Sequence, residues 1–242
     1  MAAPLRTVAM IPTYNEAGNI ATILDKLMAL DETLGCVVVD DSSPDGTARI
    51  VEDYAERFAG RIRLVVREGR GGRASAGIRG MQEAIALEPE FIVEMDADLS
   101  HDPAYILTFL DVIADCDVVV GSRFVPGGQD ADRGFIRRQV SVLSSLVFRL
   151  ILGLGVRDVG SGFKLYRREV LEALPWGAFL SSGIAISMEE LFRISKQGFS
   201  VKEVPIVFVD RTQGQSKLRL RDFVEPLKVS LQLALTLGRV QR

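Results

Sequence analysis

Residues 37–47, VVVDDSSPDGT, carry the pattern on which the fold depends. A run of β-branched residues is followed directly by two aspartates and a group of turn-forming residues. A strand with apolar side chains on both faces is typical of a parallel sheet covered by helices. Similar apolar runs alternate with helical patterns through the first half of the chain: RTVAMIP, RIRLVV, EFIVEMD and DVVVGS, with helices expected at 17–30, 45–59, 73–87 and 103–114. This alternation predicts an α/β fold with a mostly parallel sheet flanked by helices.

Polar loops follow these apolar runs. Ligands of open parallel sheets bind beyond the carboxyl ends of the strands. At those places the chain carries PTYNE, DDSSPDGT, GRGGR, DADLSH and GSRFVPGG. We therefore expect the binding site to be built from these loops.

Composition narrows the class of protein. The 242 residues are 48% hydrophobic and 25% charged, which suits one large domain or two small ones. A formal net charge of -3 disfavours nucleic acid as the main partner. Cys36 and Cys116 each adjoin a Val-rich run and are expected to be buried strand thiols. Pro12 and Glu16 interrupt the first apolar run too early for a signal peptide, so we expect a cytoplasmic protein.

The regular alternation of strand and helix patterns ends after residue 125. We expect a catalytic domain over 1–217, divided into a nucleotide-binding half (1–125) and an acceptor half (126–217). Two segments, 138–155 and 218–242, mix apolar residues with arginine, and neither has the roughly 18 uninterrupted apolar residues of a bilayer span. Both predict amphipathic helices that either rest on a membrane interface or pack on the sheet or in a dimer.

Asp96 and Asp98 follow a buried strand in VEMDADLSHDP, residues 93–103. Two nearby carboxylates repel unless a cation or a proton intervenes. Mg²⁺ and Mn²⁺ prefer carboxylate oxygens together with substrate phosphates, so we expect a metal and phosphate site here. The alternative is that both acids solvate the loop or cap the helix that begins near Pro103, a role that Asp102 already suits.

Other loop residues suggest nucleotide chemistry. We expect Asp41, in preference to Asp40, to accept hydrogen bonds from a nucleobase, while residues 42–46 form a turn. Arg123, Arg211 and Lys217 follow apolar strands and suit phosphate contacts, although loop cations are often merely solvated.

A glycine-rich stretch and the single histidine are expected to have structural roles. The glycines of GRGGRASAGIRG, residues 69–80, are expected to serve the loop and a close helix contact. A diphosphate contact by Arg70 or Arg73 is the alternative. The sole histidine, His101, is expected to support its loop rather than to act in catalysis.

The motifs together resemble a known family. IPTYNE, VVVDDSSPDGT, MDADLSHDP, VVVGSRF, GFKLYRREVL and VPIVFVDRTQGQSK occur in the order and at about the spacing of inverting family 2 glycosyltransferases with a GT-A fold. Among these, the chain most resembles the dolichol-phosphate and polyprenol-phosphate mannose synthases, from residue 7 to about 225.

The resemblance implies a site and its ligands. The donor would be GDP-mannose, the acceptor dolichyl or polyprenyl phosphate, and the cofactor Mg²⁺ or Mn²⁺. The protein would work peripherally on the cytoplasmic membrane face, with a homodimer or a membrane-anchoring partner left open. By this resemblance, the nucleotide-sugar site comprises Pro12, Tyr14, Glu16, Val39, Asp41, Asp96, Ala97, Asp98, Arg123, Arg211 and Lys217. The metal motif would be Asp96, Asp98 and Ser100, and the catalytic residues would be Asp98, Arg123 and Arg211. We also expect acceptor contacts from Arg138, Ser161 and Glu189.

The acceptor decides which chemistry is needed. A phosphate is already anionic near neutral pH and needs no strong general base. A sugar hydroxyl would need a carboxylate base, for which Glu189 or Asp158 are the candidates. The chain has GIAISMEE where the family often has Y-x-F-Q-x-E, and GRGGRASAG where it usually has G-L-G-x-A. A UDP-sugar donor, a non-lipid acceptor and a non-catalytic sugar-nucleotide binder therefore remain alternatives, and the retained acids and cations disfavour the last.

Overall fold

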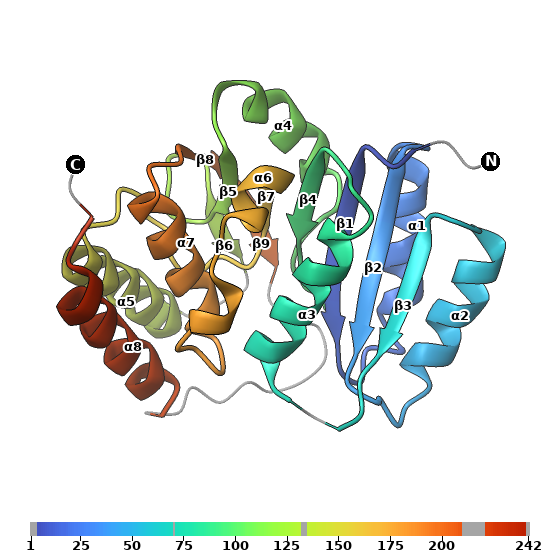
Figure 1. Ribbon diagram of the computed structural model, residues 1–242, viewed down its shortest axis with the longest axis horizontal. Helices are drawn as coiled ribbons and strands as arrows, with labels where there is room; N and C mark the ends of the chain where they lie inside the picture. Colours follow the sequence, from blue (N-terminus) through green and yellow to red (C-terminus); the bar gives the residue numbers. More distant parts are fainter. Residues whose placement is uncertain (1–3, 70, 132–134, 210–220, 241–242) are drawn as a thin grey trace.

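A seven-stranded sheet organises the protein (Figure 1). The computed structural model describes residues 4–69, 71–131, 135–209 and 221–240. The strands lie in the order β3-β2-β1-β4-β7-β5-β8. The first half alternates as predicted: β1 (Thr7–Thr13), α1 (Ile20–Leu30), β2 (Leu34–Asp40), α2 (Thr47–Arg57), β3 (Ile62–Val66), α3 (Arg73–Ile85), β4 (Phe91–Glu94), α4 (Tyr105–Val112) and β5 (Val118–Ser122). A short 3₁₀ helix, Ile113–Asp115, precedes β5.

One strand runs against the others. β7 (Lys164–Arg167) lies between β4 and β5 and pairs antiparallel with both. The prediction of a mostly parallel sheet is therefore confirmed, although no sequence pattern indicated this strand separately.

The predicted strand VKEVPIVFVD is two strands in the structure. β8 (Val201–Pro205) pairs parallel with β5 at the sheet edge. β9 (Val207–Val209) leaves this sheet and pairs with β6 (Gln129–Ala131). Ile206 stands between them and hydrogen-bonds to Ser122 and Gln129. Pro205 cannot donate a ladder hydrogen bond, which suits it to a strand end.

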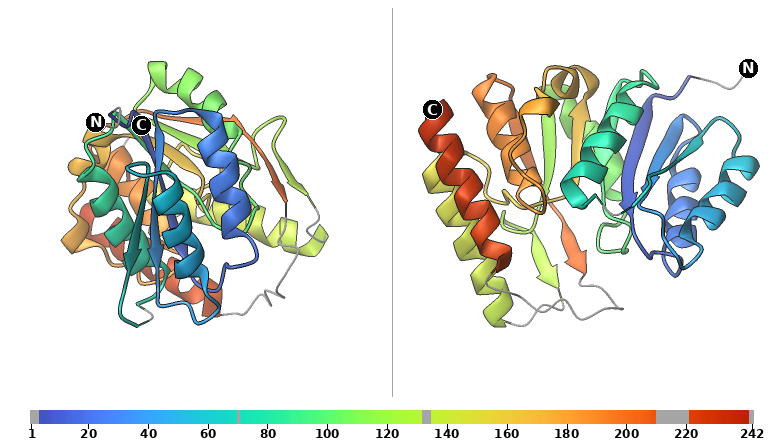
Figure 2. Two further views of the ribbon diagram at one scale, coloured as in Figure 1. Left: turned by 90° about the vertical axis from the view of Figure 1, so that its right-hand side faces the viewer. Right: turned by 60° about the horizontal axis from the view of Figure 1, so that its bottom comes forward.

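Helices cover both faces of the sheet (Figures 1 and 2). Side chains of α1, α2 and α4 pack on one face, whereas those of α3, α6 (Arg168–Glu172) and α7 (Ile186–Lys196) pack on the other. Gly80 gives α3 its close approach to the sheet, because a Cβ there would lie 2.6 Å from the Met10 sulfur. This is the close helix contact that the glycine-rich stretch predicted. Cys36 and Cys116 are free and buried, and Cys36 lies in β2 as expected, whereas Cys116 lies just before β5 rather than in a strand.

Two amphipathic helices stand at the end of the molecule farthest from β3. They are α5 (Phe135–Leu152) and α8 (Arg221–Leu237), which pack on each other and on α7 (Figure 1). Leu152, Val229 and Leu233 form the packed side of this pair. Within the described ranges, no helix is long and apolar enough to cross a bilayer. A second 3₁₀ helix, Trp176–Ala178, lies between α6 and α7.

Candidate active site

A cleft of about 720 Å³ brings the predicted acidic motif together with the second half of the chain. Its charged and polar lining includes Arg73, Asp96, Asp98, His101, Arg123 and Ser161. Side chains of α5 and α8, among them Phe148 and Phe223, also line it. The cleft therefore extends from the sheet to the amphipathic helices.

The loop after β4 is organised by its own hydrogen bonds. Asp98 Oδ1 accepts from Ser100 N (3.1 Å) and from Ser100 Oγ (2.5 Å). The Asp96 N–H donates to His101 Nδ1 (3.1 Å), and the imidazole stacks on Phe163. Because Nδ1 accepts this bond, it carries no proton, and burial lowers the pKa of His101 in the same sense. His101 thus supports the loop, as the sequence predicted.

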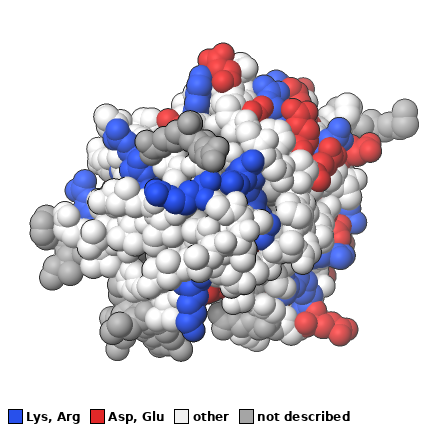
Figure 3. Space-filling model, turned by 60° about the vertical axis from the view of Figure 1, so that its left-hand side comes forward, with Lys and Arg blue, Asp and Glu red and all other residues white. Residues whose placement is uncertain are grey.

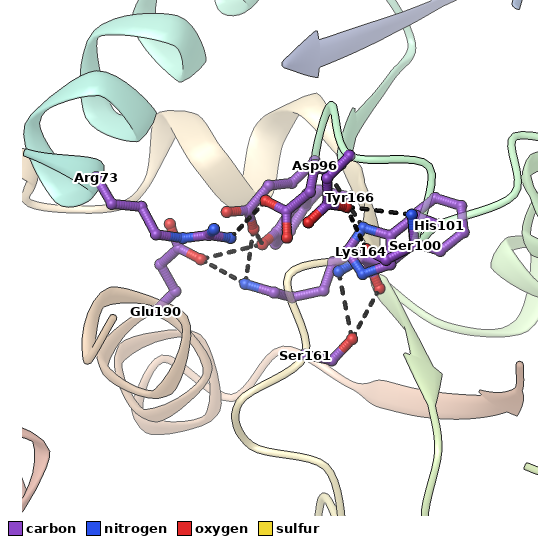
Figure 4. A network of polar contacts seen from close by, with 11 residues as sticks. Arg73, Asp96, Ser100, His101, Ser161, Lys164, Tyr166 and Glu190 are labelled. Atoms are coloured by element: carbon purple, nitrogen blue, oxygen red, sulfur yellow. Dashed lines mark hydrogen bonds and ion pairs between the residues drawn. The ribbon is translucent and has the colours of Figure 1, made fainter. Parts of the chain in front are cut away.

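Arg73 contacts the motif directly (Figure 4). It begins α3, and its Nη2 lies 2.8 Å from Asp96 Oδ1. Asp96 raises the pKa of the Arg73 guanidinium. A Cβ on Gly162 would lie 2.7 Å from Arg73 Nη2, so the guanidinium passes close to this glycine.

The acids of the motif suit a cation that binds together with phosphates. The two carboxylates and the Ser100 hydroxyl are oxygen donors of the kind that Mg²⁺ and Mn²⁺ prefer. Among the residues that the structure describes, no group of three or more His, Cys, Asp or Glu could hold a metal by itself. A divalent cation here would therefore need substrate oxygens as further ligands, and the residues present fit that requirement.

A buried carboxylate holds Arg123. Asp158, which is fully buried, accepts from Arg123 Nε (2.7 Å), Nη2 (2.7 Å) and the backbone N–H (3.0 Å). The guanidinium also lies against the rings of Phe124 and Phe208. Asp158 is in turn placed by Glu203, which accepts from its backbone N–H (3.0 Å). Arg123 enters the cleft with its orientation already set.

The predicted acceptor residues are spread over different environments. Ser161 lines the cleft and donates to the Gly121 carbonyl (2.6 Å). Arg138 lies exposed in the first part of α5. Glu189 is fully buried, and its carboxylate accepts from Leu180 N, from Ser181 N and Oγ, and from Arg193. Its neighbours Ser187 and Met188 face the cleft in its place.

The nucleotide residues gather where β1 and β2 end. Pro12 and Val39 are paired across these strands, Tyr14 and Glu16 follow β1, and Ala97 is buried beside β4. Asp40 accepts from Thr13 Oγ1 (2.8 Å) and from Ser43 N and Oγ, so it builds the turn. Asp41 forms an ion pair with Arg67. Arg211 and Lys217 lie outside the described residues.

A buried ionic cluster joins β4, β7 and α7 behind the motif (Figure 4). Lys164 Nζ lies 2.8 Å from Glu94 Oε2 and 2.6 Å from Glu190 Oε2, and the Tyr166 hydroxyl lies within hydrogen-bond distance of both acids, at 3.1 and 3.2 Å. Burial, followed by repulsion from Glu94, raises the pKa of Glu190 to about 7. No expectation from the sequence included this cluster, because its members alternate with apolar residues inside ordinary elements.

Comparisons with known proteins agree with this architecture. Residues 8–174 match the family model described as glycosyl transferase family 2. The chain is 36% identical to a polyprenol monophosphomannose synthase of Mycolicibacterium smegmatis, over 88% of this chain and 81% of that protein. It is 35% identical to an undecaprenyl-phosphate mannosyltransferase of Micrococcus luteus, over 88% of each.

Solved structures share the fold. Mannosyl-3-phosphoglycerate synthase from Rubrobacter xylanophilus superimposes with a TM-score of 0.70 at 20% identity, covering 98% of this chain and 76% of that one. A glucosyl-3-phosphoglycerate synthase from Mycobacterium tuberculosis, solved with Mn²⁺, UDP and phosphoglyceric acid, gives 0.67 at 20% identity, covering 100% and 81%. The predicted GT-A fold is thereby confirmed. With the family model matched across most of the sheet, the chain belongs to glycosyl transferase family 2 and is a glycosyltransferase.

Proposed function

We propose that this protein transfers mannose from GDP-mannose to the phosphate of a polyprenyl or dolichyl phosphate. The observation that carries the proposal is the similarity, over 88% of the chain, to two proteins named as mannosyltransferases of such lipid phosphates. The geometry of the cleft supports the same acceptor independently.

The support from the cleft comes from its carboxylates. Asp158 and Glu189 are the acids that a sugar-hydroxyl acceptor would need as a base. Asp158 is fully engaged with Arg123, and Glu189 with Arg193 and the backbone at Ser181. Both carboxylates are therefore already occupied by hydrogen bonds within the protein. A phosphate acceptor needs no general base, because it is already anionic near neutral pH.

The roles of the residues follow from a direct displacement. An acceptor phosphate oxygen attacks the anomeric carbon from the side opposite the diphosphate, the carbon–oxygen bond to GDP breaks, and the configuration inverts. Asp96 and Asp98, with Ser100, would hold Mg²⁺ or Mn²⁺, which offsets the charge of the leaving diphosphate when bound. Arg123 presents a fixed guanidinium to phosphate oxygens, and Arg211 and Lys217 are proposed to add positive charge there.

A membrane surface would supply the lipid. α5 and α8 line the cleft on one side and expose rows of apolar side chains on the other, including Leu143, Leu150, Leu231 and Leu235. Figure 3 shows this side of the molecule as mostly uncharged surface crossed by Lys and Arg, with acidic side chains mainly toward its top and right. Such a face suits peripheral contact with an anionic bilayer, and we propose the cytoplasmic face.

A transfer assay tests the proposal. Purified protein, Mn²⁺ and a polyprenyl phosphate are mixed with each of several radiolabelled GDP- and UDP-sugars. We expect label from GDP-mannose in the organic phase, loss of transfer with a chelator, and an inverted anomeric centre by NMR. Asp98→Ala should lose activity, whereas Asp102→Ala, in the same loop but exposed, should keep it. Absence of transfer from every donor would contradict the proposal.

A further inference from the structure

Arg73 is a cation at a position that does not favour one, the first residue of α3. The partial positive charge of a helix N-terminus stabilises acidic side chains in the first turn and disfavours basic ones. The first turn of α3 contains no acid, and it begins with this arginine. Arg73 therefore needs a negative partner from another part of the chain.

The acidic motif supplies that partner. Arg73 Nη2 lies 2.8 Å from Asp96 Oδ1, and the two side chains are 31% and 18% exposed. Asp96, and after it Glu94 and Asp98, raise the pKa of Arg73 against the opposing effect of burial. The guanidinium thus lies in the negative field of the same carboxylates that suit a divalent cation.

Glycines place both ends of the Arg73 side chain. Gly72 precedes α3 with a φ of +86°, which favours glycine, and a Cβ on it would lie 3.1 Å from the Ser182 carbonyl oxygen. At the far end, a Cβ on Gly162 would lie 2.7 Å from Nη2. The contact between Arg73 and Asp96 is therefore built into the fold.

This contact opposes metal binding at the motif. A divalent cation on Asp96 would be repelled by a guanidinium that already pairs with the same carboxylate. The donor changes the balance, because its diphosphate offers oxygens to a metal ion and to a guanidinium alike. Arg73 and the cation can then share the added negative charge.

We propose that Arg73 competes with the divalent cation for Asp96, so that the cation binds tightly only together with the donor diphosphate. The inference deepens the proposed function and rests on its metal site at Asp96 and Asp98. Arg73 releases Asp96 when the diphosphate gives the guanidinium another partner. Arg123 does not have this role, because Asp158, which lies outside the motif, already holds it.

Mn²⁺ binding to the full chain, followed by electron paramagnetic resonance of the free ion, tests the proposal without any transfer step. In the absence of nucleotide, Arg73→Met should bind Mn²⁺ about tenfold more tightly than the unmodified protein, a usual size for coupling between two bound groups. GDP should tighten Mn²⁺ binding to the unmodified protein more than to Arg73→Met. A merely structural role of Arg73 predicts the opposite, since damage to the site weakens Mn²⁺ binding.

Arg79→Met is the matched control. Arg79 lies on the same helix and pairs with Glu83, and its side chain is 54% exposed. The substitution removes the same charge from α3 away from the motif, so it should leave the affinity for Mn²⁺ unchanged. Arg73→Gln is a second neutral variant, expected to behave as Arg73→Met does, and thermal melting reports whether each variant folds.

The outcomes separate this inference from the proposed function. Equal Mn²⁺ affinity of the unmodified protein and the folded Arg73 variants, or an equal gain in Arg79→Met, would overturn the competition and leave the transfer assay to decide the proposed function. Absence of Mn²⁺ binding by every protein, with and without GDP, would overturn the competition and the proposed metal site together.

Discussion

Asp158 holds Arg123 with both carboxylate oxygens, so its charge should matter to a reaction that uses this guanidinium. Asp158→Asn keeps the shape but removes the charge, and the freed guanidinium can rotate away from phosphate oxygens. We expect kcat/KM for GDP-mannose to fall roughly hundredfold, as for other small misplacements of a catalytic group. Steady-state transfer assays give the value, with donor binding measured separately.

Asp117→Asn is the control for that change. Asp117 precedes β5, at the other end of the strand from Arg123, and its carboxylate accepts from Ser200 N and Oγ. The Asp117→Asn substitution should lower the free energy of unfolding but leave kcat/KM unchanged. If both variants lose activity in proportion to their loss of stability, Asp158 is structural only.

Glu190 gives the protein a pH dependence of its own. Its pKa is raised from an ordinary 4.5 to about 7, so the folded state favours the protonated acid more than the unfolded state does. The stability from this group is complete below about pH 4.5 and is lost as pH rises through 7. Between pH 5 and 8 the loss should be on the order of 1–3 kcal/mol in the free energy of unfolding.

Urea denaturation at several pH values measures this effect. Glu190→Gln cannot titrate, so the difference in unfolding free energy between it and the unmodified protein should change with pH in the stated direction. Glu172→Gln, at an exposed pair with Arg168, should give a constant difference. A constant difference for Glu190→Gln as well would mean that this carboxyl does not titrate near neutrality.

Individual site residues were predictable where a strand end exposes them. Asp96, Asp98 and Arg123 come directly after apolar runs, and the structure places all three in one cleft. Their partners were not predictable in this way. Arg73 and Asp158 are distant in sequence, and a single arginine or aspartate in a loop is most often just solvated. Only the fold brings Arg73 against Asp96 and Asp158 against Arg123.

At the scale of elements, α3 contains two glycines with opposite expected effects. A Cβ on Gly80 would lie 2.6 Å from the Met10 sulfur and 3.0 Å from Val39 Cγ2, and both neighbours are fully buried. Gly80→Ala should therefore destabilise the protein by roughly 1–3 kcal/mol, the usual effect of overpacking. A Cβ on Gly77 would meet only Ile186, at 3.9 Å. Gly77→Ala should stabilise it by about 0.5–1 kcal/mol, because alanine is the better helix former.

Denaturant unfolding of the two variants checks this contrast. Both substitutions add the same methyl group to the same helix, so propensity cancels between them and packing remains. Equal changes in the free energy of unfolding would show that α3 can shift away from β1, and that Gly80 is not needed for their contact.

Helices and strands were predictable where their pattern of apolar residues is regular. The strands of the first half are mostly apolar, and each lies where expected. β7 was not recognised, because Lys164 and Tyr166 make it look polar, although buried partners satisfy both. The break between β8 and β9 was missed for a related reason, since the apolar run continues through Ile206 while the hydrogen bonding changes sheet.

At the scale of the whole molecule, the two amphipathic segments were predictable as helices, but their free faces were not. Along α8, Val229 and Leu233 are buried while Leu231 and Leu235 are exposed, and no difference in residue type separates the two sets. Packing on α5 and α7 decides which leucines remain outside. The exposed rows leave membrane contact or self-association as the alternatives for this face.

Replacing exposed leucines with glutamate separates these alternatives. Leu143 and Leu235 are 60% and 86% exposed, on α5 and α8 respectively. The double variant Leu143→Glu, Leu235→Glu should bind anionic phosphatidylglycerol vesicles at least about tenfold more weakly in co-sedimentation, because it loses apolar insertion and adds repulsion. Leu107→Glu, on α4 and 46% exposed, is the matched control and should bind as before.

Raising the salt should weaken binding of the unmodified protein only in part, since apolar burial is not screened. The opposite outcome is that the unmodified protein does not bind vesicles and sediments as a dimer, whereas the double variant sediments as a monomer. In that case the face is an interface between two copies of the chain.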